Sequence, residues 1–248
     1  MSSYRRSIAV LSFSMIVVML GFGIVIPIFP FFIESLGVGG RELGVLAAIA
    51  SLMEFLCAPI WGAVSDRVGR KPVLLTGLVG YFLGMVLMGI ATTFPQLLII
   101  RALSGVLSSA TLPTSMAFVS DVTSDDDRAD GIGILGSAMG LGVIIGPGVG
   151  GLLGSENIQL PFFISAFLSL VAAILVYFTV PESLKESKDS IDVQSPLKGL
   201  KEALTGTFGV LFFLAFLLSF GLTNFEAIFG LYVSGKFGYG PERVGVIL

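Results

Sequence analysis

The chain has 248 residues, of which 54% are hydrophobic and only 12% are charged, with a formal net charge of −3. A soluble domain carries about a quarter charged residues, so this composition predicts an all-α membrane protein rather than a water-soluble one. The sequence contains no histidine and a single cysteine, which excludes histidine-based catalysis and an intrachain disulfide.

Seven runs are long and apolar enough for membrane-spanning helices, which need about 20 residues each. They are Ile8–Ile33, Leu43–Val64, Val73–Thr92, Leu97–Val119, Ile132–Gly154, Leu160–Val180 and Phe208–Val233, and an eighth begins near Val244. The first run is longer than the apolar core of a cleaved signal sequence, so we interpret it as a retained span. Lysine and arginine gather in alternate connections, which predicts a multi-pass protein of the plasma membrane with a cytoplasmic N-terminus.

Two prolines three residues apart, Pro27 and Pro30, stand at the end of the first run. Proline removes a backbone donor and interrupts a helix. We therefore expect these two residues to shape the wall of a cavity, with an ordinary helix end as the alternative.

Two carboxylates stand alone in apolar runs, Glu54 in the second and Glu226 in the seventh. An apolar environment favours the neutral form of a carboxyl group, so such a residue can bind and release a proton. Both are candidates for proton coupling or for recognition of a cationic substrate. The alternative is a structural residue paired with a neighbour.

The connection between the second and third runs reads Gly62-Ala-Val-Ser-Asp66-Arg67-Val-Gly69-Arg70-Lys71. We expect Gly62 to let helices approach closely and Gly69 to form a tight turn with positive φ. The carboxylate of Asp66 can accept charge-assisted hydrogen bonds, and we expect Arg128, which follows an acidic loop, to pair with an acid such as Asp66. A loop that merely retains basic residues on the inner side is the alternative.

Arg101 lies inside the fourth run. An arginine within a membrane helix is costly and normally faces a partner or an aqueous cavity. Because it lies near the end of the run, the alternative is a side chain that extends to the membrane surface.

The fifth run is rich in glycine and contains Gly142, Gly146, Pro147, Gly150 and Gly151. Glycines four residues apart allow two membrane helices to pack closely, and Pro147 can kink its helix. General helix packing is the alternative to a dedicated motif.

The longest polar stretch, residues 181–205, predicts a cytoplasmic linker between a six-helix unit at 1–180 and an incomplete second unit at 206–248. The blocks Leu36–Ala47 and Phe237–Leu248 resemble each other at an offset of 201, since 237 − 36 = 201. Their shared residues are Gly37, Gly39, Gly44 and Val45, which recur as Gly238, Gly240, Gly245 and Val246. A parallel repeat of six-helix units explains this pattern, with chance matching of glycine-rich loops as the alternative. On that interpretation we expect the chain to be truncated in its eighth span, where missing helices or a second copy would complete it.

Residues 62–71 resemble the signature loop of the major facilitator superfamily, and residues 142–151 are similar to the fifth-helix motif of its drug/proton antiporters. The segment from Gly21 to Pro30 is similar to the first-helix motif of the twelve-helix exporters. The resemblance implies the major facilitator fold, with a complete N-terminal six-helix half, helix seven and the start of helix eight. It also implies that Asp66, Arg67 and Arg70 of the signature loop belong to a cytoplasmic gate and that Arg101 takes part in proton coupling. We expect Gly62, Gly69, Lys71 and Arg128 to belong to the same gate.

These patterns favour a secondary transporter that exports small amphipathic or cationic organic compounds in exchange for protons, by alternating access between the two sides of the bilayer. A proton-coupled metabolite symporter of the same fold and a truncated fragment without transport are the alternatives. The expected partners are a small-molecule substrate, protons and lipid, with no nucleic acid because no basic stripe is present. We expect no enzyme activity, cofactor or metal, because the sequence has no nucleophile–base or metal-ligand cluster.

Overall fold

The computed structural model describes residues 3–184 and 209–248, and all regular structure within these ranges is helical. The helices in chain order are α1 (Ser3–Val25), α2 (Phe29–Ser35), α3 (Gly40–Val68), α4 (Arg70–Ile90), α5 (Phe94–Ser108), α6 (Thr111–Val122), α7 (Arg128–Glu156), α8 (Leu160–Thr179), α10 (Gly209–Phe237) and α11 (Pro241–Ile247). Seven segments of the described chain are long and apolar enough to cross a membrane, and they coincide with the seven predicted runs. The predicted all-α membrane class is therefore confirmed.

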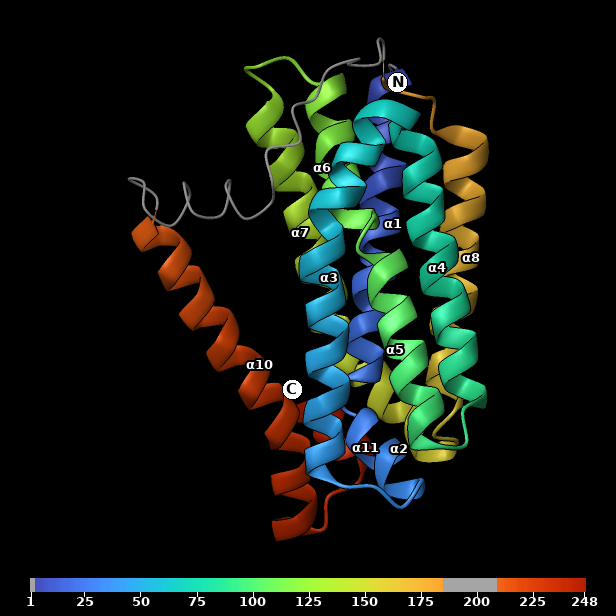
Figure 1. Ribbon diagram of the computed structural model, residues 1–248, viewed down its shortest axis with the longest axis vertical. Helices are drawn as coiled ribbons and strands as arrows, with labels where there is room; N and C mark the ends of the chain where they lie inside the picture. The colour runs from blue at the N-terminus through green and yellow to red at the C-terminus, as the bar shows by residue number, and fades with distance from the viewer. Residues whose placement is uncertain (1–2, 185–208) are drawn as a thin grey trace.

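Helices α1 to α8 run up and down in an upright bundle, from which α10 diverges (Figure 1). The N-terminus and the connection between α3 and α4 lie at one end of the molecule, while α2 and α11 lie at the other. Near this second end α10 contacts α2, α3 and α11. We call the first end the Arg70 end, after the charged cluster described below, and the second the α2 end.

The centre of the bundle is α1, which packs along most of its length against α7 and α8. Its buried side chains include Leu11 and Met15. On the far side of α8, the Ser169 hydroxyl donates a 2.9 Å hydrogen bond to the Leu78 carbonyl oxygen of α4. Buried residues from all six spans between α1 and α8 join one hydrophobic core. The six-helix unit at 1–180 stays a prediction.

The first span is broken near its end, as its two prolines predict. Helix α1 stops at Val25 and the chain turns through residues 26–28 before α2 starts at Phe29. Pro27 and Pro30 supply no N–H group to the helical ladder, so the turn forms where two of its bonds, three residues apart, would be absent.

The fourth span is also broken, between α5 and α6, and this break was not predicted. Pro113 has no N–H for the Ser109 carbonyl, and its ring crowds that oxygen. The Ala110 N–H bonds to Leu107 at 3.2 Å, one residue short of the α-helical partner. The Val106 carbonyl is thereby released, and it accepts a 2.6 Å hydrogen bond from the Trp61 indole of α3.

The two repeat blocks share their backbone conformation. Gly37 and Gly238 both have positive φ, 75° and 65°. Two residues later in each block, an extended glycine is followed by the first residue of a helix, α3 or α11. Equivalent glycines at the predicted offset thus make the same turn. The linker prediction lies mostly outside the described residues, so the unit boundaries at 180 and 205 stay predictions.

Candidate functional site

A cavity of about 690 Å³ lies between α1, α3, α4 and the break that separates α5 from α6. Apolar side chains of α1 form one wall, among them Met15, Met19 and Phe22. The break contributes the hydroxyl groups of Ser108, Ser109 and Thr111. Glu54, at the midpoint of α3, is the one charged residue among those that line it, and its side chain is accessible. We call this space the Glu54 cavity.

A second cavity, of about 640 Å³, lies closer to the α2 end. Its lining is apolar except for Arg101 of α5 and Thr223 and Glu226 of α10. The guanidinium of Arg101 lies over the Phe29 ring, 4.3 Å from its centroid, a distance at which a cation and an aromatic face attract. We call this space the Arg101 cavity. The predicted arginine thus faces a cavity, and Pro30 lines the same space whereas Pro27 does not.

The two cavities meet at Phe22, which lines both. The three predicted coupling candidates are therefore divided between them, with Glu54 on one side of Phe22 and Arg101 with Glu226 on the other. Glu54 and Arg101 nonetheless interact electrostatically with each other and with Tyr81 of α4. One carboxylate, one guanidinium and one phenol thus lie near one another beside the two cavities.

A cluster of paired charges marks the Arg70 end. Arg70 forms an ion pair with Asp66, and its Nε lies 2.9 Å from Oδ2 of Asp121 at the end of α6. Its Nη1 also donates to the Ser65 hydroxyl at 2.7 Å, and the Ser183 hydroxyl donates to Asp121 at 3.1 Å. The side chain of Arg70 is only 9% exposed. A charge this well enclosed needs both carboxylates to offset its desolvation, so the cluster fixes α3, α4 and α6 to one another.

Glu182, just after α8, binds backbone groups of α4 at the same end of the molecule. Its carboxylate accepts hydrogen bonds from the N–H groups of Arg70 and Lys71, at 2.8 and 3.1 Å. These are among the donors that the first turn of a helix leaves without partners. Gly69 has φ of 117°, and a Cβ there would lie 2.5 Å from a Glu182 oxygen. The predicted positive-φ turn is confirmed, and the glycine also leaves the space that the carboxylate occupies.

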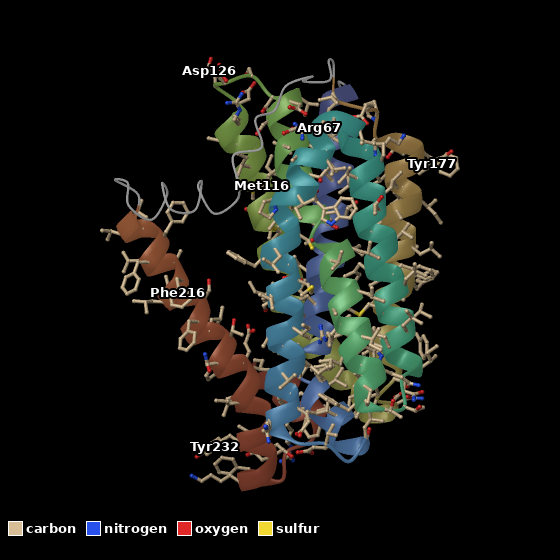
Figure 2. All side chains as sticks on the ribbon, viewed as in Figure 1. Arg67, Met116, Asp126, Tyr177, Phe216 and Tyr232 are labelled. Atoms are coloured by element: carbon tan, nitrogen blue, oxygen red, sulfur yellow. The ribbon has the colours of Figure 1, made fainter. Side chains whose placement is uncertain are left out.

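Two expectations for this end were wrong. Arg128 pairs with Asp125, 2.8 Å away and one turn earlier in the chain, rather than with Asp66. The nearer acid satisfies Arg128, and Arg70 already occupies Asp66. Gly62 does not mediate close helix contact, because no atom of another described helix lies within 4 Å of where its Cβ would be. Of the remaining loop residues, Arg67 is exposed at this end (Figure 2) and Lys71 lies 5.4 Å from the centroid of the Tyr177 ring.

The glycines of α7 form a seam against α1, as their four-residue spacing predicts. A Cβ on Gly142 would lie 2.7 Å from the Ile16 carbonyl oxygen, and one on Gly146 would lie 2.7 Å from Cα of Gly23. A Cβ on Gly150 would overlap the Ile24 carbonyl oxygen. The two helices are therefore in direct backbone contact along three turns.

The next glycine, Gly151, faces a different helix. A Cβ on Gly151 would lie 2.5 Å from the Pro241 carbonyl oxygen and 3.1 Å from Cα of Gly245, both in α11. Helix α7 continues unbroken through Pro147, from Arg128 to Glu156. The sequence motif thus joins α7 to α1 on one face and to α11 on another, without interrupting the helix.

The sequence profile of the Major Facilitator Superfamily matches residues 11–248. The chain belongs to this superfamily. Membership also supports the prediction that the chain is not an enzyme, because the superfamily comprises transporters.

Two bacterial relatives match nearly the whole chain. Multidrug resistance protein 1 of Bacillus subtilis (strain 168) is 33% identical over 254 residues, which cover 100% of this chain and 64% of that protein. Quinolone resistance protein NorA of Staphylococcus aureus is 26% identical over 244 residues, covering 98% of this chain and 63% of that protein. The chain thus spans less than two thirds of the length of these relatives.

Solved structures share the fold at lower identity. The human organic anion transporter MFSD10 (TETRAN) superposes with a TM-score of 0.75 at 22% identity, over 98% of this chain and 68% of that chain. A bacterial homolog of the human lysosomal transporter Spinster, in an inward-facing and unoccupied conformation, superposes with a TM-score of 0.80 at 16% identity, over 99% of this chain and 58% of that chain. The helical arrangement is therefore that of major facilitator transporters, and the chain is a multi-pass membrane protein.

Three residues of the two regions were not identified from the sequence. Asp121 and Glu182 are ordinary acids at the ends of their runs, and they reach Arg70 only through the fold. Tyr81 is an aromatic residue in an apolar run, a position usually occupied by a core side chain. Asp121 and Glu182 carried the same local signal, since each is an acid at the end of a span that lies at the same end as the basic loop.

Proposed function

We propose that the protein exports small amphipathic or cationic organic compounds across the plasma membrane in exchange for protons. The observation that carries this proposal is the position of Glu54, the one charged residue lining an otherwise apolar and hydroxyl-bearing cavity. An ionised carboxylate there attracts a cation, while its protonated form does not. A proton and a cationic substrate would therefore compete for the same group, which is the requirement for exchange.

The lining of the Glu54 cavity fits the apolar part of such a substrate. Met15 and Met19 are flexible and polarizable, and Phe22 offers an aromatic face to a cation. A wall of this kind adapts to ligands of different shape. The names of the Bacillus and Staphylococcus relatives, which refer to multidrug and quinolone resistance, support export over uptake.

Glu226 and Arg101 form the second part of the proposed site. They line the other cavity together, with Glu226 on α10, in the predicted second unit. A change in the position of α10 relative to the bundle would alter the distance between this acid and the Arg101 guanidinium. We propose that this pair couples proton binding to alternating access, while Pro30 and Phe29 shape the wall.

Transport of ethidium, a fluorescent lipophilic cation, tests the proposal in inside-out vesicles from cells that express the complete gene. With an acidic lumen, we expect ethidium to accumulate as protons leave, and Glu54→Gln to abolish this exchange while the protein still inserts. Glu34→Gln is the matched control, because Glu34 is exposed near the α2 end and lines neither cavity. Unchanged exchange in Glu54→Gln contradicts the proposal, and movement of protons and substrate in the same direction would instead favour the symporter.

We further propose that the Arg70 end faces the cytoplasm. Arg67, Arg70, Lys71 and Arg128 belong to that end, whereas Arg41, Lys236 and Arg243 belong to the opposite one, and basic residues favour the inner side. In a Cys57→Ser background, Arg67→Cys should be shielded from a membrane-impermeant thiol reagent in intact cells while Tyr232→Cys reacts. The reverse pattern would invert the proposed orientation.

A further inference from the structure

The two cavities are successive sections of one space between the same helices. Helices α1, α3, α4 and α5 each contribute lining residues to both cavities. On α4, Tyr81 lines the Glu54 cavity and Met85, about one turn further, lines the Arg101 cavity. On α5, Ser108 and Arg101 are divided in the same way, about two turns apart. The cavities therefore follow each other along the bundle.

One side chain stands between these two sections. Among the described residues, Phe22 of α1 is the only one common to the two linings, and it is 48% exposed although α1 is the central helix. The lining residues of α1 follow the three- and four-residue spacing of a single helix face. They are Met15, Val18 and Met19 in the Glu54 cavity, Phe22 in both, and Val25 and Ile26 in the Arg101 cavity. Phe22 is thus the centre of one apolar stripe that passes both cavities.

The glycines on either side of Phe22 fix the direction of its ring. A Cβ on Gly21 would lie 2.6 Å from the Tyr81 hydroxyl oxygen, and one on Gly23 would lie 3.0 Å from Cα of Gly146. Position 21 therefore faces α4 and position 23 faces α7, both at close range. Successive residues of a helix point about 100° apart, so the side chain between them takes a third direction, toward the cavities. Rotation of α1 to withdraw the ring would drive its backbone into the neighbouring helices.

The two sections differ in the charge that they present. The Glu54 cavity has one carboxylate and several hydroxyl groups, whereas the Arg101 cavity has a guanidinium beside Glu226. An organic cation held at Glu54 has its charged group in the first section, and its apolar part can follow the α1 stripe as far as the Phe22 ring. The ring then separates the bound compound from the Arg101 and Glu226 pair.

We propose that Phe22 is a specificity-determining residue of the exchange site, whose ring divides one elongated space and limits the length of the cation that Glu54 can hold. This inference rests on the proposed binding of cations at Glu54. The ligand class is then an organic cation whose apolar part ends at the ring. The Arg101 cavity stays free of substrate, so its charged groups remain available for coupling.

Alkyltrimethylammonium cations test this limit, because they combine a constant charge with a tail that grows by single methylenes. Each cation competes with ethidium exchange in vesicles from cells that express the complete gene. Tails of about four to about twelve carbons are compared, and each methylene that is buried should strengthen competition about four-fold. In the wild type we expect this gain to stop at one tail length, the cut-off, where the tail reaches Phe22.

Removal of the ring should move the cut-off to longer tails. In Phe22→Ala, a cation two methylenes beyond the wild-type cut-off should compete about 15-fold better than in the wild type. Partitioning of long tails into the membrane affects both proteins alike. Phe22→Leu should shift the cut-off less, and it provides the test if Phe22→Ala lowers the yield of folded protein or its exchange activity. Phe167→Ala is the matched control, because Phe167 is exposed on α8 and lines neither cavity, and it should keep the wild-type cut-off.

A second substitution determines where the longer tail lies. Ala47 of α3 lines the Arg101 cavity but not the Glu54 cavity. In the Phe22→Ala background, Ala47→Leu fills part of the space behind the removed ring and should return the cut-off toward its wild-type length. A cut-off that stays long in the double variant overturns the inference, because the tail would then extend elsewhere.

The outcomes separate this inference from the proposed function. Ethidium exchange that survives Glu54→Gln contradicts the proposed function and the inference that rests on it. Exchange that requires Glu54, but with the same cut-off in Phe22→Ala as in the wild type or with no cut-off in either, overturns the role of Phe22 alone. A loss of competition in Phe22→Ala that is equal for short and long tails also overturns it, because the ring would then serve only as an aromatic contact for the charged group.

Discussion

The Arg70 end and the middle of the bundle handle polar groups in opposite ways. At the Arg70 end, one guanidinium binds two carboxylates and a serine, and a third carboxylate holds two backbone N–H groups. In the middle, the hydroxyl of Tyr81 and Nε of Arg101 have no partner within the described chain. A saturated network holds one geometry, whereas groups without fixed partners can respond to a proton or a ligand. The first region is suited to fixing helices and the second to changing state.

Removal of Arg70 should cause the largest loss of stability and is the strongest test of this contrast between the two regions. Arg70→Ala leaves Asp66 and Asp121 facing each other without a cation, and we expect a loss of about 2–3 kcal/mol of stability, less than a fully buried pair because both acids are partly exposed. Unfolding by SDS in mixed micelles measures this loss. Arg128→Ala removes an exposed ion pair between residues three apart in the chain. It should reduce stability by less than about 0.5 kcal/mol. Equal effects of the two variants would mean that the Arg70 cluster is only a surface network.

The connection between α3 and α4 gives the next largest effect. Gly69→Ala forces a non-glycine residue into positive φ and against Glu182, and we expect a loss of about 1–3 kcal/mol. Gly62→Ala provides a control of opposite sign, because that glycine lies within α3 in open space and alanine should stabilise the helix by up to about 1 kcal/mol. Both values come from the same micelle titration. A loss in Gly62→Ala would show that this glycine has a packing role after all.

The break in the fourth span lies between the two regions, and changes there should have a smaller effect on stability. Trp61→Phe removes the indole donor to the Val106 carbonyl and should cost about 1 kcal/mol in the free energy of unfolding. Ser109→Ala removes the weaker second donor to the same oxygen, at 2.9 Å, and should cost less. If Ser109→Ala were the more damaging change, the serine rather than the tryptophan would hold the break.

The smallest expected change in stability belongs to the middle of the bundle. Glu54→Gln should alter the free energy of unfolding by less than about 0.5 kcal/mol, because Glu54 lines an accessible cavity rather than a closed network. Asp121→Asn, which weakens the Arg70 cluster, is the comparison and should cost more. A large loss of stability in Glu54→Gln would assign this residue to structure rather than to exchange.

Much of the fold follows from local features of the sequence. Apolar length alone located all seven spans, because the bilayer sets the length of a spanning helix, and the paired prolines at 27 and 30 predicted the first break. Pro113 carries the same physical signal for the second break, but it lies inside a continuous apolar run and was not interpreted. The seam of α7 followed from its glycine spacing, although the helices that it faces did not.

The two regions were harder to predict because their partners are distant in sequence. Glu182 binds backbone groups 111 and 112 residues away, and no periodicity links it to them. The predicted partner of Arg128 was wrong because Asp125, only three residues away, lies within reach of its guanidinium. Glu54, Arg101 and Glu226 were identified as unusual charges in apolar runs, but only the packing of the helices shows which of them share a cavity.

The glycine seam between α1 and α7 has a mechanical consequence. Without a layer of side chains between them, these two helices cannot slide past each other, since any axial shift would drive carbonyl oxygens of one backbone into the Cα atoms of the other. We therefore expect α1 and α7 to move together as one rigid unit when a passage opens. The α1 side chains that line the two cavities, among them Phe22, would move with that unit. We expect bending to occur elsewhere, at the two breaks in the helices of the first and fourth spans.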